Sequence, residues 1–183
     1  MNTTTDQPSN CPSPANSKRI IVAGLGAMGL PMANRLYDKG FNVFGFDIAP
    51  PKGQNLPLLS QLSNLTEDDI LLVVVRDASQ IAEVCFTQQA VFDQPTYPKT
   101  LVVCSTISPN AIHRLSDTLP KDVSLIDAPM SGAPYRAKDG TLTFMVGGAQ
   151  CGIAQLKPIF QSLGADIHYL GKLARIFHEG GPV

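Results

Sequence analysis

Short apolar runs alternate with amphipathic stretches of helical length along most of this chain. Apolar runs of this kind are typical of strands covered on both faces of a sheet. We expect strands at Arg19–Ala23, Asn42–Phe46, Ile70–Val75, Leu101–Cys104, Ser124–Ile126, Leu142–Val146 and Asp166–Leu170. Helical periodicity occupies the stretches Met28–Tyr37, Ala78–Phe86, Asn110–Thr118 and Gly152–Leu163. This alternation predicts a doubly wound α/β domain with a mainly parallel, Rossmann-type sheet, parallel except at its last strands.

Several helix ends carry their own local evidence. Asp77 and Ser108 directly precede two of the expected helices, where a side-chain oxygen can accept from free first-turn amides. Gly40 and Gly164 fit the ends of the first and last helices.

The segment 48–69 departs from this pattern. A doubly wound fold would place a helix, a strand and another helix here, but the segment reads IAPPKGQNLPLLSQLSNLTEDD and contains three prolines. We therefore expect an abbreviated or irregular crossover.

Composition narrows the function classes. The chain has 183 residues, 44% of them hydrophobic and 16% charged, which suits one globular domain. A net charge of −1 provides no basic field for nucleic acid, and no apolar run is long enough to span a bilayer. The four cysteines show no C-x-x-C spacing, so we expect no metal site.

Residues 1–18 are polar and contain no secretory signal, so we expect a disordered tail and a cytoplasmic protein.

A glycine-rich segment, GLGAMGLPM, joins the first expected strand to the first expected helix. In a dinucleotide-binding loop Gly24 permits the tight turn, Gly26 lets a diphosphate approach the backbone, and Gly29 allows close helix–strand packing. The anion would then face free amides and the positive end of the helix dipole. The alternative is a plain tight turn.

Asp47 ends the second expected strand, about twenty residues after the glycines. A carboxylate at this position accepts both ribose hydroxyls of an adenosine and repels a 2′-phosphate. No arginine follows it, because the next residues are Ile48, Ala49 and Pro50. NAD is therefore favoured over NADP. The alternative is a solvated carboxylate at a strand end.

Three motifs together resemble one family. The segments GLGAMGLPMANRL, CSTISP at 104–109 and DAPMSGAPYRAKDGTLTFMVGG at 127–148 are similar to those of the β-hydroxyacid dehydrogenases. That family includes 3-hydroxyisobutyrate dehydrogenase, tartronate semialdehyde reductase and the more distant 6-phosphogluconate dehydrogenase. The resemblance covers about residues 18–171, so we expect an NAD(P)-binding domain over 19–171.

The resemblance implies roles for individual residues. Ser105 and Thr106 would border the nicotinamide, and Ser131 and Gly132 would bind a substrate carboxylate. The implied cofactor-binding set is Gly24, Leu25, Gly26, Ala27, Met28, Gly29, Asp47, Ser105 and Thr106. Helix capping by Thr106 and Ser108, and turn formation by Ser131, are the competing interpretations.

Two positions depart from the family pattern. Ala133 replaces the second glycine of an S-G-G triplet, which alters the loop if that glycine needs a positive φ. Arg76 lies in the segment VVVRDAS, close to the cofactor, where the family commonly has an apolar residue and proline. It either pairs with Asp77 at the surface or places a cation beside the ligand.

The family's chemistry is hydride transfer between a short 3-hydroxy acid and nicotinamide, assisted by a lysine in a K-x-x-N-N pattern on a later helix. The segment 172–183 shows no such pattern, so we assign no catalytic residue, and Lys172 is expected to be a surface lysine. We expect a cofactor domain that is weakly active or inactive alone. The alternatives are a non-catalytic dinucleotide-binding or interaction module, or a fragment of a longer enzyme that self-associates through the face its helical domain would cover.

Overall fold

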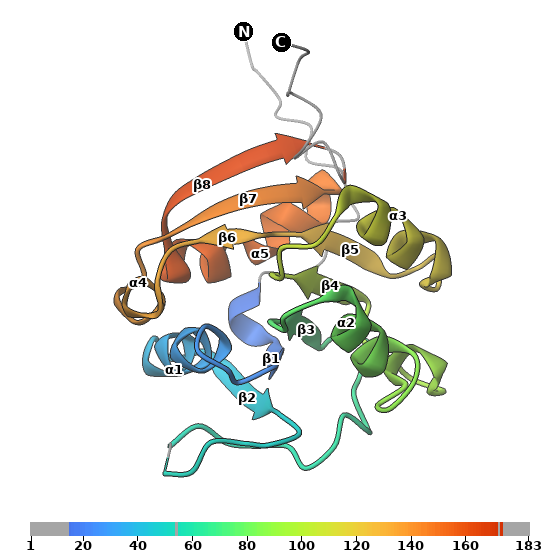
Figure 1. Cartoon of the computed structure of the whole chain (residues 1–183), viewed down its shortest axis with the longest axis horizontal. Helices are drawn as coiled ribbons and strands as arrows, with labels where there is room; N and C mark the ends of the chain where they lie inside the picture. The colour runs from blue at the N-terminus through green and yellow to red at the C-terminus, as the bar shows by residue number, and fades with distance from the viewer. Residues whose placement is uncertain (1–14, 54, 172, 174–183) are drawn as a thin grey trace, which may run out of the picture.

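The computed structural model describes residues 15–53, 55–171 and 173, which fold around one twisted sheet (Figure 1). Its strands are β1 Arg19–Ala23, β2 Asn42–Phe46, β3 Ile70–Val73, β4 Thr100–Val103, β5 Ser124–Asp127, β6 Met130–Ser131, β7 Leu142–Gly148 and β8 Gly164–Gly171. The α-helices are α1 Gly29–Asp38, α2 Ala78–Cys85, α3 Pro109–Thr118, α4 Pro134–Asp139 and α5 Gln150–Leu163. A 3-10 turn at Val91–Asp93 follows α2.

The sheet order is β2-β1-β3-β4-β5-β7-β6, with β8 paired to β7. The first five strands in this order are parallel, whereas β7 runs antiparallel to both β5 and β6. The predicted doubly wound fold, with its departure from parallel pairing at the last strands, is therefore confirmed. The order reverses between β1 and β3, and ligands of open α/β sheets bind at such a switch point.

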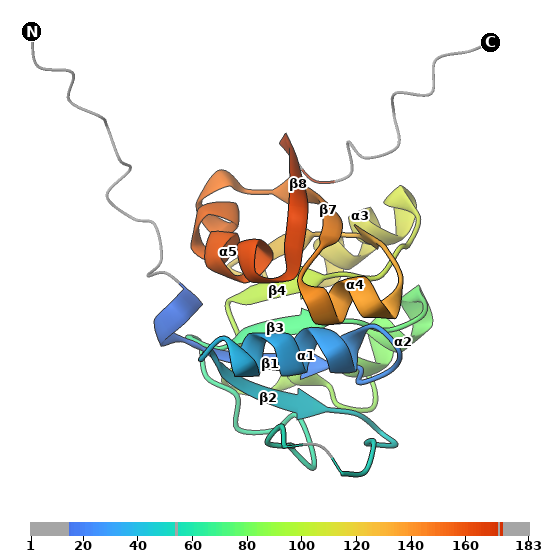
Figure 2. The same cartoon turned by 90° about the vertical axis from the view of Figure 1, so that its left-hand side faces the viewer.

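Each face of the sheet carries its own hydrophobic core. On one face, α1 and α5 bury Met32, Leu36, Leu156 and Phe160 against the strands. In Figure 2, α4 and α5 lie beside α1 on this side. The other face is covered by α2 and α3 together with leucines of the irregular crossover. Burial on both faces explains why β1, β3 and β4 are apolar almost throughout.

The structure adds two short elements that the sequence pattern did not predict. Both β6 and α4 lie inside the 127–148 motif and span two and six residues. Neither is long enough to show periodicity. Pro134 at the start of α4 and the left-handed Gly140 at its end were the available evidence.

The expected tail boundary at residue 18 is wrong. Ala15–Ser17 forms a 3-10 helix against α5, and the Ala15 side chain is fully buried. The end of this polar segment is therefore part of the fold. Residues 1–14 lie outside the described part of the chain, as does the predicted 172–183 tail apart from Leu173.

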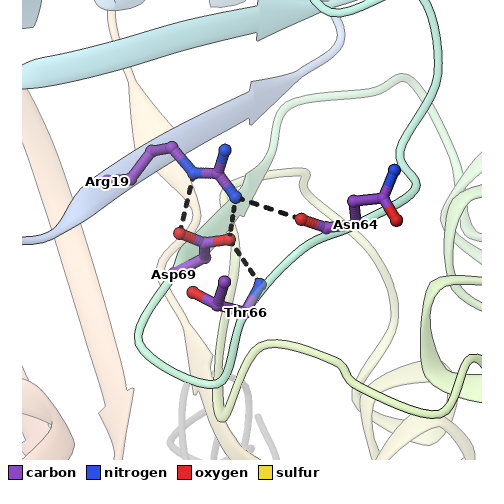
Figure 3. A network of polar contacts seen from close by, with 4 residues as sticks. All are labelled: Arg19, Asn64, Thr66 and Asp69. Carbon is purple, nitrogen blue, oxygen red and sulfur yellow. Dashed lines mark hydrogen bonds and ion pairs between the residues drawn. The ribbon is translucent and has the colours of Figure 1, made fainter.

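The crossover 48–69 contains no helix among its described residues and touches β2 through a bridge between Gly45 and Leu58. An ion pair holds its far end (Figure 3). Arg19 Nε donates to Asp69 Oδ1 at 2.8 Å, and the other Asp69 oxygen accepts from the Thr66 amide at 2.7 Å. The predicted irregular crossover is confirmed, and polar contacts to the backbone replace helical hydrogen bonds in fixing its path.

The predicted helix caps behave as expected, with one exception. Asp77 accepts from the Gln80 amide at 3.0 Å, and Ser108 accepts from the Ala111 amide at 3.3 Å. Gly40 has φ +86° just beyond α1. Gly164 is extended instead, with φ −132°, and a Cβ there would lie 2.8 Å from the Leu142 oxygen. Close approach to β7, not a left-handed cap, requires glycine at that position.

Candidate functional site

A cavity of about 630 Å³ opens at the carboxyl ends of the parallel strands. The loops after β1, β2, β3 and β4 form its wall, and the β6 region adds to it. The predicted site residues on this wall are Gly24, Gly26, Ala27, Met28, Gly29, Asp47, Ser105, Thr106 and Gly132. The fold thus gathers segments that are far apart in sequence around one space.

The three glycines of the loop meet different constraints. Gly24 has φ +99°, and a Cβ there would lie 2.3 Å from the Val74 oxygen. A Cβ on Gly29 would lie 1.8 Å from the Gly24 oxygen, so the helix start packs directly on the turn. A Cβ on Gly26 would meet nothing within 4 Å. Packing requires glycine at positions 24 and 29, whereas Gly26 faces open space in the cavity wall.

The start of α1 has hydrogen-bond donors to spare. Met28, at the N-cap, makes no side-chain capping bond. No hydrogen bond from the amides of Gly26, Ala27 and Met28 to another described residue is found. Pro31 has no N–H, and the Leu30 amide donates to the Gly26 oxygen at 3.1 Å, so the free donors are the three amides before the helix. Together with the helix dipole they favour an anion. Leu25 contributes only its backbone, because its side chain is in the core at 4% exposure.

Asp47 is fastened to the glycine loop. Its Oδ2 accepts from the Leu25 amide at 2.7 Å, and its Oδ1 accepts from the Ala49 amide at 2.9 Å. The carboxylate is half-buried and lines the cavity. Each carboxylate oxygen keeps a further lone pair for a ligand hydroxyl. Asp47 is therefore more than a solvated strand end, because it orients the loop beside it.

Ser105 and Thr106 lie at the end of β4 with different environments. The Ser105 hydroxyl donates to the Val75 oxygen at 2.6 Å and accepts from the Val75 amide at 3.1 Å. It is 5% exposed and ties two loops of the cavity together. Thr106 is exposed on the wall, and Ser108, not Thr106, caps α3. Only Thr106 of this pair offers an unengaged hydroxyl.

Of the two residues expected to bind the substrate carboxylate, Ser131 and Gly132, only one lines the cavity. Gly132 lines the cavity with φ +143°, whereas Ser131 is exposed on β6 and is not part of the cavity wall. Ala133 has φ −88°, an ordinary value for any L-residue. The glycine that the loop needs is therefore Gly132, and the alanine at 133 does not distort it.

Sequence reasoning missed the polar wall opposite the glycine loop. Gln80 and Glu83 of α2 and Gln88 just beyond it line the cavity. Their spacing puts the first two on one face of the helix. From sequence alone a polar helix face is interpreted as solvent-exposed, because only the sheet order shows that it borders the cavity. Arg76, which the sequence singled out, also lines this wall.

A buried acid ends β5. Asp127 ends β5 with 5% exposure, and desolvation raises its pKa to about 7. Burial, with a smaller contribution from Asp127, raises the pKa of the adjacent Cys104 thiol, which lines the cavity. A thiol in this state is a poor nucleophile.

Among the described residues, no group of histidine, cysteine and acidic side chains is arranged to hold a metal ion. No described helix combines the length and apolar character that crossing a membrane needs. Lys172, the expected surface lysine, lies outside the described residues.

Comparisons with known proteins identify the kind of domain. Residues 19–171 match the model of the NAD binding domain of 6-phosphogluconate dehydrogenase. The chain is 34% identical over 154 residues to 2-hydroxy-3-oxopropionate reductase of Escherichia coli, covering 81% of this chain and 53% of that protein. It is 28% identical over 159 residues to 3-hydroxyisobutyrate dehydrogenase of Pseudomonas aeruginosa, covering 83% and 53%.

Solved structures show the same architecture. The 3-hydroxyisobutyrate dehydrogenase of Mycobacterium tuberculosis, solved with L-serine, superposes with a TM-score of 0.74 at 25% identity, covering 86% of this chain and 55% of that one. The chain thus spans about half the length of the relatives it matches. With its glycine loop, sheet order and match over 19–171, this chain belongs to the β-hydroxyacid dehydrogenase family as an NAD-binding domain.

Proposed function

We propose that the cavity binds NAD(H) with its diphosphate over Gly26 and its adenosine ribose on Asp47. The observation that carries this proposal is the set of unpartnered amides at the start of α1, facing a cavity that a half-buried carboxylate also lines. Free amides, the helix dipole and the missing Cβ all favour an anion in contact with the backbone.

We propose NAD over NADP as the preferred cofactor. Asp47 carries a negative charge at the ribose side, and both of its oxygens are already held by backbone amides. A 2′-phosphate would meet this fixed charge at short range, where repulsion is weakly screened. Ribose hydroxyls, by contrast, can donate to the remaining lone pairs.

The wider activity follows from the family. We propose hydride transfer between nicotinamide and a short 3-hydroxy acid, with the cofactor performing the redox step. Thr106 would border the nicotinamide, with Ser105 fixing its loop. The amide of Gly132 and the hydroxyl of Ser131 would hold the substrate carboxylate. The resemblance gives the proton transfer to a lysine in a K-x-x-N-N pattern, and the described residues contain no such pattern. We therefore expect the chain alone to turn over 3-hydroxyisobutyrate weakly or not at all. A cytoplasmic location stays a prediction.

Nucleotide titration tests the cofactor proposal. We expect the wild-type chain to bind NADH, followed by fluorescence, and to bind it at least about tenfold more tightly than NADPH, a difference of about 1.4 kcal/mol. Asp47→Asn keeps an oxygen for the Leu25 amide but removes the charge, so it should narrow that preference. The matched control is Asp38→Asn, on the last residue of α1 and outside the cavity wall. Absence of NADH binding by the wild-type chain would overturn the proposal.

A further inference from the structure

The charge balance of the cavity is unfavourable for a diphosphate except at one place. Among the described residues that line it, Asp47 and Glu83 are acidic and Arg76 is the single cationic residue. The α1 amides supply only a partial charge, roughly half a proton charge for a whole helix. A diphosphate bridge adds two negative charges, so a full cation on the wall would matter to its binding.

Arg76 belongs to a loop that runs beside the glycine turn. The Val74 amide donates to the Ala23 oxygen at 2.8 Å, and the Val74 side chain lies 3.3 Å from where a Cβ on Gly29 would be. Arg76 comes two residues later. Since β1 lies between β2 and β3, Arg76 and Asp47 rise on opposite sides of the glycine loop.

The arginine backbone is fixed while its guanidinium is unengaged. Gln80 Oε1 accepts from the Arg76 amide at 3.0 Å, and the Asp77 carboxylate accepts from the Gln80 amide at 3.0 Å. The neighbouring carboxylate is thus used for capping α2. No ion pair or hydrogen bond joins the Arg76 guanidinium to another described residue, so the surface pairing with Asp77 considered from sequence is not observed.

We propose that Arg76 is the cation that holds the diphosphate bridge of the dinucleotide, opposite the amides of α1. The inference rests on the proposed cofactor function and gives a role to a residue that departs from the family pattern. Contact with a 2′-phosphate is disfavoured because that group would lie on the Asp47 side of β1. An arginine can donate two parallel hydrogen bonds to phosphate oxygens, which gives it geometry as well as charge.

Calorimetric titration of wild type, Arg76→Gln and the control Lys121→Gln tests this assignment. Arg76 and Lys121 are both exposed, so both variants should keep the wild-type melting temperature, and Lys121 lies outside the cavity wall. We expect Arg76→Gln to bind ADP and NADH about tenfold or more weakly, as befits a lost charged hydrogen bond. Adenosine, which lacks phosphate, should bind the variant and the wild type equally. Lys121→Gln should bind all three like wild type.

Two results would overturn the inference while leaving the cofactor function intact. One is wild-type affinity of Arg76→Gln for ADP and NADH. The other is a loss confined to NADPH, which would place the guanidinium at the 2′-phosphate. If the wild-type chain itself failed to bind NADH, the proposed function would fall as well. A weaker salt dependence of ADP binding in Arg76→Gln would further support a contact between opposite charges.

Discussion

Two glycines of the same loop are required for different reasons, one for the packing of the fold and the other for access by a ligand. Gly29 has the Gly24 carbonyl where its Cβ would be, whereas Gly26 has open cavity. The first constraint comes from the protein backbone, which cannot retreat without moving β1. The second comes from the space that a ligand would fill.

The pair predicts opposite phenotypes for the same substitution. Gly29→Ala should lower the free energy of unfolding by roughly 3 kcal/mol, because overpacking here meets backbone. Gly26→Ala should leave stability within about 1 kcal/mol of wild type and yet weaken NADH binding, because the methyl group occupies the diphosphate position. Urea denaturation and NADH titration of both variants check this. A stable Gly29→Ala protein would contradict the packing argument.

Asp127 predicts an unusual pH dependence. Its folded pKa of about 7 lies above the value for an unfolded aspartate, so the folded protein holds a proton that the unfolded chain has lost at intermediate pH. Stability from this group is therefore complete below about pH 4 and falls as the pH rises toward 7. Asp127→Asn should gain stability relative to wild type, by up to about 4 kcal/mol, between those limits.

Urea denaturation across this pH range provides the measurement. Asp122→Asn is an informative control, because a hydrogen bond from Lys99 lowers the pKa of that exposed carboxyl. Between pH 4 and 7 the stability of Asp122→Asn relative to wild type should therefore stay constant, and it should rise only as the pH falls below about 4. A flat difference between Asp127→Asn and wild type would show that the carboxyl titrates normally.

Residue chemistry in the glycine loop was predictable from sequence because each role follows from local spacing. The environments of Ser105 and Asp127 were not, since they depend on which strands become neighbours. Ser105 lines the cavity as expected, but its hydrogen bond to Val75 of the adjacent loop had no signal in the local sequence. Arg76 was noticed as a departure, but only the cavity wall showed which way to interpret it.

At the scale of elements, the path of the irregular crossover 48–69 is fixed by polar side-chain contacts, whereas a helix is held by its own backbone hydrogen bonds. Asp69 is 3% exposed and satisfies both Arg19 and the Thr66 amide. A carboxylate that serves a guanidinium and a backbone donor together cannot be removed without leaving a partner unsatisfied.

Adjacent aspartates supply a matched test. Asp69→Ala should lower the free energy of unfolding by about 3 kcal/mol, because it leaves Arg19 partly buried without its partner. Asp68→Ala removes a carboxylate that is 89% exposed from its ion pair with Lys18, and because water screens that carboxylate the loss should be less than about 1 kcal/mol. Thermal unfolding of both variants distinguishes them, and equal losses would mean that Asp69 acts only as a surface charge.

Long elements were predictable and short ones were not. The helices α1, α2, α3 and α5 and the longer strands agree with the sequence pattern to within about two residues, because periodicity needs several turns or alternations. The two-residue β6 is defined by its pairing with Phe144 and Thr143 of β7, residues that are not its neighbours in the sequence. No local pattern carries that information.

For the whole molecule, β8 forms the end of the sheet beyond β7. It pairs only with β7 among the described residues, and its Tyr169 is 48% exposed. An unpaired edge of eight residues is a template for another strand.

We therefore expect concentration-dependent self-association in sedimentation velocity experiments. Tyr169→Lys should shift the equilibrium toward monomer, because an edge charge opposes strand addition. Tyr37→Lys is the control, since it replaces a tyrosine of similar exposure, 41%, on α1. If both lysine variants behaved alike, β8 would not be the contact.

The hydroxyl of Ser105 has a thermodynamic consequence for the cavity as a whole. By bonding both the amide and the carbonyl of Val75, it makes the segments after β3 and β4 a single unit before any ligand arrives. The conformational entropy of ordering these two loops is thus lost when the protein folds and not when a ligand binds. A ligand would bind to a preformed cavity wall. Because the loops after β3 and β4 are joined, a ligand that moves one of them should also move the other.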